Sequence, residues 1–185
     1  MPARKTTGFN RRIVNNTAKF FLEFVEIVIM VLAISWFSQT YVFGVVTIKD
    51  HSMLPTLESN NRVLVSKVLR NRTLDRGDII ALYKETETNA TEKATVKRVI
   101  GLAGDTVEIR NGYVYINNKP YYEPDLSTPV TLEFSPVVVP KNHVFVLNDN
   151  RLDDNDSRKW GSIPIEKVIG EVQLCYWPLF QIKFL

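Results

Sequence analysis

Cysteine and histidine are almost absent from this 185-residue sequence, which contains one cysteine and two histidines. Cys175 has no second cysteine to pair with, so an internal disulfide is excluded, and a place in the core of a strand is expected for it. No group of histidines and cysteines has the spacing of a metal site. The sequence therefore predicts neither a bound metal nor another cofactor.

An excess of charge of one sign is also missing from most of the chain. Residues 1–19 hold five basic residues and no acidic one, and residues 20–43 hold two glutamates. Of the 23 basic and 20 acidic residues, eighteen of each sign therefore remain in residues 44–185. Such a balanced segment gives no indication of a nucleic-acid surface. The basic start is typical of the cytoplasmic flank of a membrane protein.

One long apolar run, Phe20 to Phe43, is present. At about 1.5 Å of rise per residue it is long enough to cross a bilayer as a helix. A cleavable signal peptide is the alternative, because Ala33-Ile34-Ser35 is a small-x-small triplet. The triplet lies in the middle of the run, which favours an uncleaved anchor with Trp36 and Tyr41 near the outer interface. The predicted organisation is a cytoplasmic flank (1–19), a transmembrane anchor (20–43) and an extracytoplasmic β-rich domain (44–185).

The segment after the anchor is predicted to be mainly β, because short β-branched or aromatic runs alternate with turn signals. Asn111-Gly112 between two such runs indicates a tight hairpin. A polar loop is expected over Glu85 to Lys93, and an irregular excursion over Tyr121 to Ser135. The predicted strands are 45–48, 62–65, 78–83, 95–100, 106–110, 113–116, 143–147 and 170–177.

The stretch Asp50-His51-Ser52-Met53-Leu54-Pro55-Thr56-Leu57 follows the apolar run. Pro55 fixes one backbone angle and removes a donor, so a turn or strand end is expected there. A neighbouring side chain is then held out of the sheet, which suits Ser52 as a nucleophile. By itself, the same pattern also fits an ordinary loop serine.

A lysine inside an apolar strand is the matching partner. Lys97 stands in the run Thr95-Val96-Lys97-Arg98-Val99-Ile100, which a Gly-Leu-Ala-Gly-Asp turn closes. Burial penalises the charged form of a lysine, so a lowered pKa is expected for Lys97 and its neutral amine becomes available as a base. A serine with a neutral lysine is one form of the activated nucleophile.

Three stretches in this order resemble the sequence boxes of the type I signal peptidases. They are Ser-Met-Leu-Pro-Thr-Leu at 52–57, Lys-Arg-Val-Ile-Gly-Leu-Ala-Gly-Asp at 97–105, and Asn-Asp-Asn-Arg with Asp-Ser-Arg within 148–158. The likeness covers nearly the whole chain, and the single anchor and short length are similar to the compact Gram-positive members. It implies an antiparallel β-sheet catalytic domain of the signal-peptidase type, preceded by one transmembrane helix.

The resemblance also implies an activity and a set of site residues. The activity is removal of signal peptides from exported preproteins at the outer membrane face, after small-x-small sites, with Ser52 and Lys97 as catalytic residues. The backbone N–H of Ser52 would stabilise the oxyanion. Shallow pockets for small side chains would be lined by Val46, Ile48, Leu57, Val63 and Val96. The structural support would come from Asp149, Asn150, Arg151, Asp156 and Arg158.

Several positions depart from the family pattern. Asp50 stands two residues before the nucleophile, where glycine or an oxyanion-assisting serine is usual, and its ionised carboxylate would repel the oxyanion. Asp154 stands where a lysine-orienting serine is common, and a carboxylate reaching Lys97 would favour the ammonium form. Asn148 and Ala103 replace the usual glycine and proline. These changes motivate a second hypothesis, a signal-peptidase-like protein with a specialised or non-catalytic role, for example in pilin processing or assembly.

Three smaller alternatives accompany this reading. A Ser-His-Asp site would need His51 or His143, but neighbours on an extended chain point to opposite sides, so His51 is poorly placed for Ser52. The acidic stretch 149–156 could be a calcium loop, although an arginine lies within it and no central glycine does. The tail Trp177-Pro178-Leu179-Phe180 is expected in a buried final strand, with a place on the lipid surface as the alternative.

Overall fold

The computed structural model describes residues 7–68, 74–83, 94–123, 126 and 132–185, and gives the backbone alone for residues 7–18. The chain divides into two compact units, Met1–Tyr41 and Val42–Leu185. Each unit has a different composition and is described by itself.

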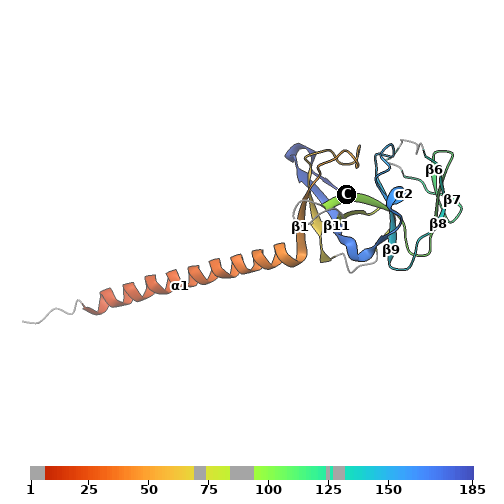
Figure 1. Cartoon of the computed structure of the whole chain (residues 1–185). Coiled ribbons are helices and arrows are strands. Elements are labelled where there is room, and N and C mark those ends of the chain that lie inside the picture. The colour runs from red at the N-terminus through yellow and green to blue at the C-terminus, as the bar shows by residue number, and fades with distance from the viewer. Residues whose placement is uncertain (1–6, 69–73, 84–93, 124–125, 127–131) are drawn as a thin grey trace, which may run out of the picture. The chain divides into compact units, whose positions relative to one another are not determined.

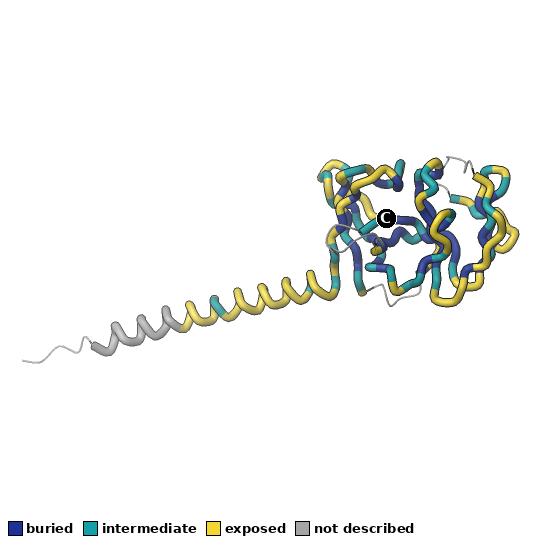
Figure 2. The backbone as a smooth tube through the Cα atoms, in the orientation of Figure 1, coloured by how far each residue is buried: buried dark blue, intermediate teal, exposed yellow. Residues whose placement is uncertain are grey.

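The first unit is a long helix (Figure 1). Helix α1 spans Thr7–Phe37 and continues into a π-helical turn, η1, at Ser38–Val42. Within the described residues, Lys19–Val42 is the one helical segment that is long and apolar enough to cross a membrane, with 24 residues and a mean hydropathy of 2.2. The described residues of the helix are mostly exposed (Figure 2). Among them, the apolar Phe20 and Trp36 are 71% and 67% exposed. Such a surface is stable in a lipid environment, so the helix is suited to membrane association.

The second unit is built around an eight-stranded antiparallel sheet. In space the main strands run β1 (Phe43–Thr47), β2 (Arg62–Ser66), β11 (Val168–Trp177), β3 (Ile79–Tyr83), β4 (Ala94–Gly101), β9 (His143–Leu147) and β10 (Ile163–Pro164). The eighth strand, β12 (Lys183–Phe184), pairs with β11. Strands far apart in sequence are thus neighbours, which brings residues near 50, 97 and 150 within reach of one another.

A four-stranded antiparallel sheet completes the domain. Its order is β7 (Lys119–Pro120), β6 (Tyr113–Ile116), β5 (Thr106–Arg110) and β8 (Phe134–Val138). Figure 1 shows β6, β7 and β8 together at the side of the domain away from β1. The hairpin predicted at Asn111-Gly112 is confirmed, because both residues have positive φ angles, 51° and 80°.

Short helical turns connect the later strands. Helix α2 (Ser157–Trp160) lies between β9 and β10, η3 (Ile165–Lys167) precedes β11, and η4 (Leu179–Gln181) follows it. Asp156 caps α2, since its carboxylate accepts a hydrogen bond from the Arg158 N–H. The acidic stretch predicted as a loop therefore ends in one turn of helix.

The predicted mainly β architecture is confirmed. Each of the eight predicted strands is present, with ends that differ by two residues or fewer. The expected loop at Glu85 to Lys93 lies outside the described residues, as do residues 124, 125 and 127–131 of the excursion from Tyr121 to Ser135. The described end of that excursion is already strand, because β8 begins at Phe134.

The burial of two segments tests two predictions, one for Cys175 and one for the tail at 177–180. Cys175 on β11 is fully buried, as predicted for a core cysteine. The prediction of a buried final strand at 177–180 is wrong, because Leu179 and Phe180 are 68% and 85% exposed. Both residues belong to η4, which lies between β11 and β12 and has no buried residue.

Candidate active site

Ser52 lies in a tight turn that follows β1. Met53 and Leu57 are fully buried, and the Leu57 N–H donates to the Met53 carbonyl over 2.8 Å. Before the turn, the Ile48 N–H donates to Asn61 O over 2.9 Å, which joins the two ends of the segment between β1 and β2. The two buried side chains anchor the turn in the core, so Ser52 is held in place and is itself 2% exposed.

Lys97 reaches Ser52 from the middle of the large sheet. It lies on β4, opposite Ile80 of β3, and is 1% exposed. Its Nζ is 3.2 Å from Ser52 Oγ, although 45 residues separate the two in sequence. The structure therefore brings together the two residues predicted to be catalytic, in an environment that excludes most water.

Asp50 also contacts Ser52, and it does so twice with the same oxygen. Its Oδ1 accepts the Ser52 hydroxyl proton over 2.7 Å and the Ser52 backbone N–H over 3.2 Å. Because a hydroxyl has one proton, the contact from Lys97 is then a donation from Nζ–H to Ser52 Oγ. The carboxylate expected near the oxyanion position is therefore present at the nucleophile itself.

Asp154 does not lie where the family pattern suggested. Its Oδ1 pairs with Lys159 Nζ over 2.9 Å, and the two side chains are 38% and 61% exposed. The hydrogen bond from Lys159 lowers the pKa of Asp154, against a small opposing effect of desolvation. Lys159 follows Asp154 across the first turn of α2 and captures its carboxylate, so Asp154 pairs with Lys159 rather than orienting Lys97.

Trp160 is the residue near Lys97 that sequence reasoning missed. The Lys97 Nζ lies 5.7 Å from the centroid of the Trp160 ring, within the range of a cation–π contact. The indole Nε1–H donates to Asn155 Oδ1 over 3.1 Å, which fixes the ring. The available signal was an aromatic residue two positions after the Asp-Ser-Arg box, at the end of the single turn of α2.

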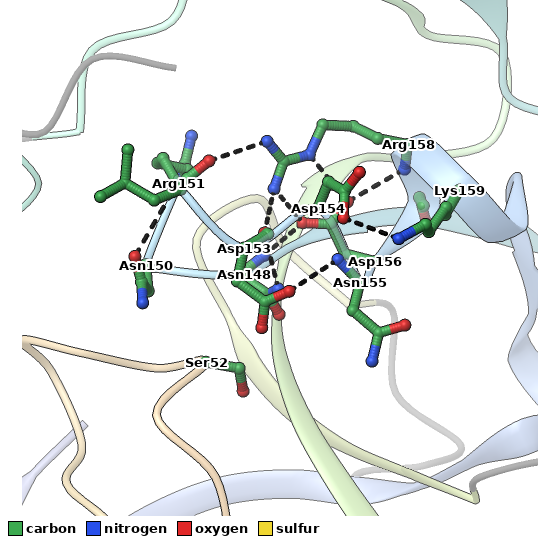
Figure 3. A network of polar contacts seen from close by, with 12 residues as sticks. Ser52, Asn148, Asn150, Arg151, Asp153, Asp154, Asn155, Asp156, Arg158 and Lys159 are labelled. Atoms are coloured by element: carbon green, nitrogen blue, oxygen red, sulfur yellow. Dashed lines mark hydrogen bonds and ion pairs between the residues drawn. The ribbon is translucent and has the colours of Figure 1, made fainter. Parts of the chain in front are cut away.

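The acidic loop, residues 148–158, is held by its own charges (Figure 3). Arg158 Nε and Nη2 donate to the two carboxylate oxygens of Asp156 over 2.9 and 2.7 Å. A further Arg158 N–H donates to the Arg151 carbonyl, and the Asn148 N–H donates to Asp156 Oδ2. The Asp156 and Arg158 side chains are 0% and 4% exposed, so this is a buried ion pair with its remaining hydrogen-bonding groups satisfied.

The acidic loop is hydrogen-bonded both to the turn that holds Ser52 and to the strand that holds Lys97. Asp149 accepts two hydrogen bonds from Arg98, the neighbour of Lys97, over 2.8 and 2.6 Å. Burial lowers the pKa of Arg98, but its hydrogen bonds to Asp149 and the nearby negative charges together outweigh burial, so the net pKa is raised. The Asn150 N–H donates to the Ser52 carbonyl over 2.9 Å. The loop thereby links the segment that holds Ser52 to the strand that holds Lys97.

Another buried arginine in the acidic loop, Arg151, pairs with a residue outside the loop. Arg151 is 2% exposed and forms an ion pair with Glu123 over 2.5 Å. The carboxylates of Asp149 and Asp156 face Arg98 and Arg158, so the loop's buried acids are matched by arginines. The placement of these residues fits the structural support that the family resemblance implied.

The five residues predicted to line substrate pockets lie together. They belong to one apolar cluster with Met53, which adjoins Ser52 in sequence. All five are 9% exposed or less. Their burial places an apolar wall next to the nucleophile, while their contact with a substrate stays a prediction. These residues are Val46, Ile48, Leu57, Val63 and Val96.

No contact joins a histidine to Ser52 within the described residues. His51 is exposed, and His143 on β9 has its Nδ1 2.9 Å from the Lys141 carbonyl. The polar side-chain contacts of Ser52 are made with Asp50 and Lys97. The arrangement therefore favours a lysine over a histidine as the base.

Comparison with known proteins gives consistent matches. The model of the family described as signal peptidase, peptidase S26, matches residues 21–177. A probable signal peptidase I-2 of Synechocystis sp. is 36% identical over 150 residues, or 80% of this chain and 69% of that protein. Signal peptidase I S of Bacillus subtilis is 32% identical over 178 residues, or 89% of this chain and 94% of that protein. The crystal structure of a signal peptidase I from Enterococcus faecalis aligns with 54% of this chain and 97% of that chain, at 30% identity and a TM-score of 0.47.

Proposed function

The chain belongs to the signal peptidase family, peptidase S26, and on this premise we propose that Ser52 and Lys97 are its nucleophile and general base. Its activity is that of a signal peptidase I, a serine endopeptidase that removes signal peptides from preproteins. One observation carries the assignment of the dyad. The Lys97 Nζ lies 3.2 Å from Ser52 Oγ in a site where both residues are buried.

The proposed reaction proceeds through an acyl-enzyme. The neutral Lys97 amine takes the proton of Ser52 Oγ as that oxygen attacks the peptide carbonyl, and it returns the proton to the leaving amine. Water then attacks the ester with Lys97 again as base. The Ser52 backbone N–H donates to the oxyanion of each tetrahedral intermediate. Trp160 and the apolar surroundings keep water away from the Lys97 amine between turnovers.

The substrate is an exported preprotein cut after a small-x-small sequence. The apolar cluster that adjoins Ser52 supports this, because a closely packed apolar wall suits small uncharged side chains. We assign Val46, Ile48, Leu57, Val63 and Val96 to the walls that contact those groups.

We further propose a single membrane span with a cytoplasmic N-terminus. The flank is residues 1–19, the anchor is residues 20–43, and the catalytic domain, residues 44–185, is extracytoplasmic. The basic flank and the uncovered apolar helix support this orientation. A signal peptide held in the same bilayer would meet the site at a raised effective concentration.

The test is cleavage of a model preprotein by the detergent-solubilised full chain. Ser52→Ala and Lys97→Ala should each lower kcat/KM by about 10³-fold or more, as expected when a member of a catalytic pair is removed. Ser59→Ala and Lys141→Ala change the same residue types outside the site and should leave cleavage unchanged. Mass spectrometry of the products identifies the bond that is cut.

Two results would contradict the proposal. Cleavage that survives in Lys97→Ala would assign the base to another group. A folded wild-type protein without activity would favour the second hypothesis, a specialised or non-catalytic role in surface-protein assembly, and the contacts of Asp50 with Ser52 would then be its structural basis.

A further inference from the structure

One oxygen of Asp50 engages both groups of Ser52 that the reaction needs. Asp50 Oδ1 lies 2.7 Å from Ser52 Oγ and 3.2 Å from the Ser52 backbone nitrogen. In the proposed reaction the hydroxyl proton must pass to Lys97, and the N–H must donate to the substrate oxyanion. In the present arrangement both protons point at the same carboxylate oxygen, so neither is available for its catalytic role.

The charge of this oxygen resembles that of the reaction intermediate. An ionised carboxylate oxygen that accepts the Ser52 N–H stands where an oxyanion would accept it, and both bear negative charge. The two cannot share the donor, because like charges at this distance repel strongly in a site with little water.

The Asp50 carboxylate can also leave Ser52 for the solvent. The residue is exposed, whereas Ser52 and Lys97 are buried. Its carboxylate can therefore turn into solvent and be hydrated there, with little of the desolvation cost that moving a buried charge would involve.

We propose that the Asp50 carboxylate is a built-in occupant of the oxyanion position, which holds Ser52 in a resting arrangement until the oxyanion that forms on a bound substrate displaces it. This inference rests on the proposed function, because it assumes that Ser52 is the nucleophile. It assigns to Asp50 a positioning role that slows turnover, because the carboxylate leaves Ser52 only as the oxyanion forms.

Kinetics of three variants test the proposal. Asp50→Gly and Asp50→Ser remove the carboxylate and should raise kcat about tenfold with KM changed by less than threefold, a small fraction of what a full oxyanion contact contributes. Asp50→Glu retains the charge and serves as the matched control, with no such gain. The exposed position makes the variants compatible with folding, which thermal unfolding checks. A fall or no change in kcat for both Asp50→Gly and Asp50→Ser would overturn the proposal.

A second measurement separates this proposal from the one on which it rests. In a peptide aldehyde with a small-x-small sequence, Ser52 Oγ bonds to the aldehyde carbon as the C=O π bond opens, the Ser52 hydroxyl proton passes to Lys97, and the carbonyl oxygen becomes the oxyanion-like group. The affinity of the aldehyde should rise about tenfold in Asp50→Gly and Asp50→Ser, whereas the affinity of the corresponding peptide amide should stay the same. If the role of Asp50 were purely structural, its replacement would change the affinities of the aldehyde and the amide alike.

The pattern of aldehyde binding identifies which idea has failed. In one outcome, the aldehyde binds tightly, Ser52→Ala abolishes this binding, and the Asp50 variants do not alter it. That result would overturn the role of Asp50 and leave Ser52 as the nucleophile. Aldehyde binding that is indifferent to Ser52→Ala would overturn both. The expected result is dependence on Ser52 in every protein, with the gain confined to the variants without the carboxylate.

Discussion

The acidic loop and the turn that carries Ser52 are held in opposite ways. In the acidic loop, buried carboxylates face buried arginines, as in the pair of Asp156 with Arg158, and each end of the pair has further hydrogen bonds. At the turn, the Ser52 hydroxyl meets the exposed residue Asp50 and the buried amine of Lys97. Breaking the first arrangement strands a charge in the protein interior, whereas breaking the second moves one carboxylate into water.

This difference distinguishes a rigid support of the site, the acidic loop, from its moving part, the Asp50 side chain at Ser52. A paired and enclosed network has one low-energy arrangement, because every alternative leaves a buried group without a partner. A contact to an exposed side chain can be exchanged for a contact to water at small cost. The comparison therefore predicts large effects on stability in the acidic loop, and effects on rate with little loss of stability around Ser52.

The largest effect is expected for Asp156→Ala. The change leaves the buried Arg158 guanidinium without its carboxylate and removes the cap of α2. Loss of a buried pair's partner costs about 3–5 kcal/mol, which corresponds to a fall of roughly 10 °C in the unfolding midpoint of a domain of this size. Circular dichroism of the detergent-solubilised protein measures it. Asp153→Ala is the matched control, since its Oδ1 accepts a single bond from the Asn155 N–H in an exposed setting, and equal shifts for both variants would contradict the comparison.

A paired carboxylate outside the acidic loop shows whether pairing or location matters. Asp105, between β4 and β5, accepts hydrogen bonds from Arg76, from the Leu102 N–H and from Asn117. Burial raises the pKa of Asp105, but these hydrogen bonds outweigh it and the net pKa is lowered. Asp105→Asn should lower the free energy of unfolding at pH 7 by about 1.5–3 kcal/mol, the usual contribution of hydrogen bonds to a charged group.

The sign of the pH dependence gives the check on Asp105. Because the folded pKa lies below the unfolded value of about 3.9, the stabilisation is present above that value and is lost as the pH falls through the folded pKa. The difference between wild type and Asp105→Asn should therefore shrink below about pH 4. Urea unfolding at several pH values measures this difference. A constant difference across the acid range would show that the carboxylate charge contributes nothing.

The fold was largely predictable because successive side chains of a strand point to opposite faces of a sheet, which leaves a pattern of buried β-branched residues in the sequence. Every predicted strand is five residues or longer in the structure, apart from β6, and has buried β-branched side chains. The strands that sequence reasoning missed include the two-residue β7, β10 and β12, which are too short to show a period. Strand β8 has mostly exposed residues, so its sequence does not show the alternation of a half-buried strand.

The site was predictable as a set of residues but not as a set of contacts. Ser52 and Lys97 stand in recognisable boxes, and the sheet order brings them together. The partners of Asp50 and Asp154 depend on local geometry instead. Asp50 is two residues from Ser52 and turns back to it, and Asp154 is taken by Lys159 across the first turn of α2. Sequence spacing alone predicts neither of these contacts.

Trp160 links the two regions, so its replacement should change rate more than stability. Trp160→Ala uncovers the Lys97 amine and should lower kcat/KM about tenfold with little change in KM, whereas Trp160→Phe retains a ring and most of the activity. Trp177→Ala is the matched control. This residue is similarly exposed, and its ring centroid lies 5.9 Å from the Arg62 guanidinium. A loss of activity in Trp177→Ala equal to that in Trp160→Ala would remove the special role of the Lys97 contact.

The smallest effect is expected at Asp154, which belongs to the acidic loop but not to its buried network. Its partner Lys159 is 61% exposed, and an exposed pair of this kind contributes about 0–1 kcal/mol. Asp154→Ala and Asp154→Ser should therefore leave the unfolding midpoint and the cleavage rate nearly unchanged, as should Lys159→Ala. The three variants are compared in the preprotein assay. A tenfold gain in rate for Asp154→Ala but not for Lys159→Ala would mean that this carboxylate acts on Lys97 during turnover, and the division between support and moving part would then run through the acidic loop itself.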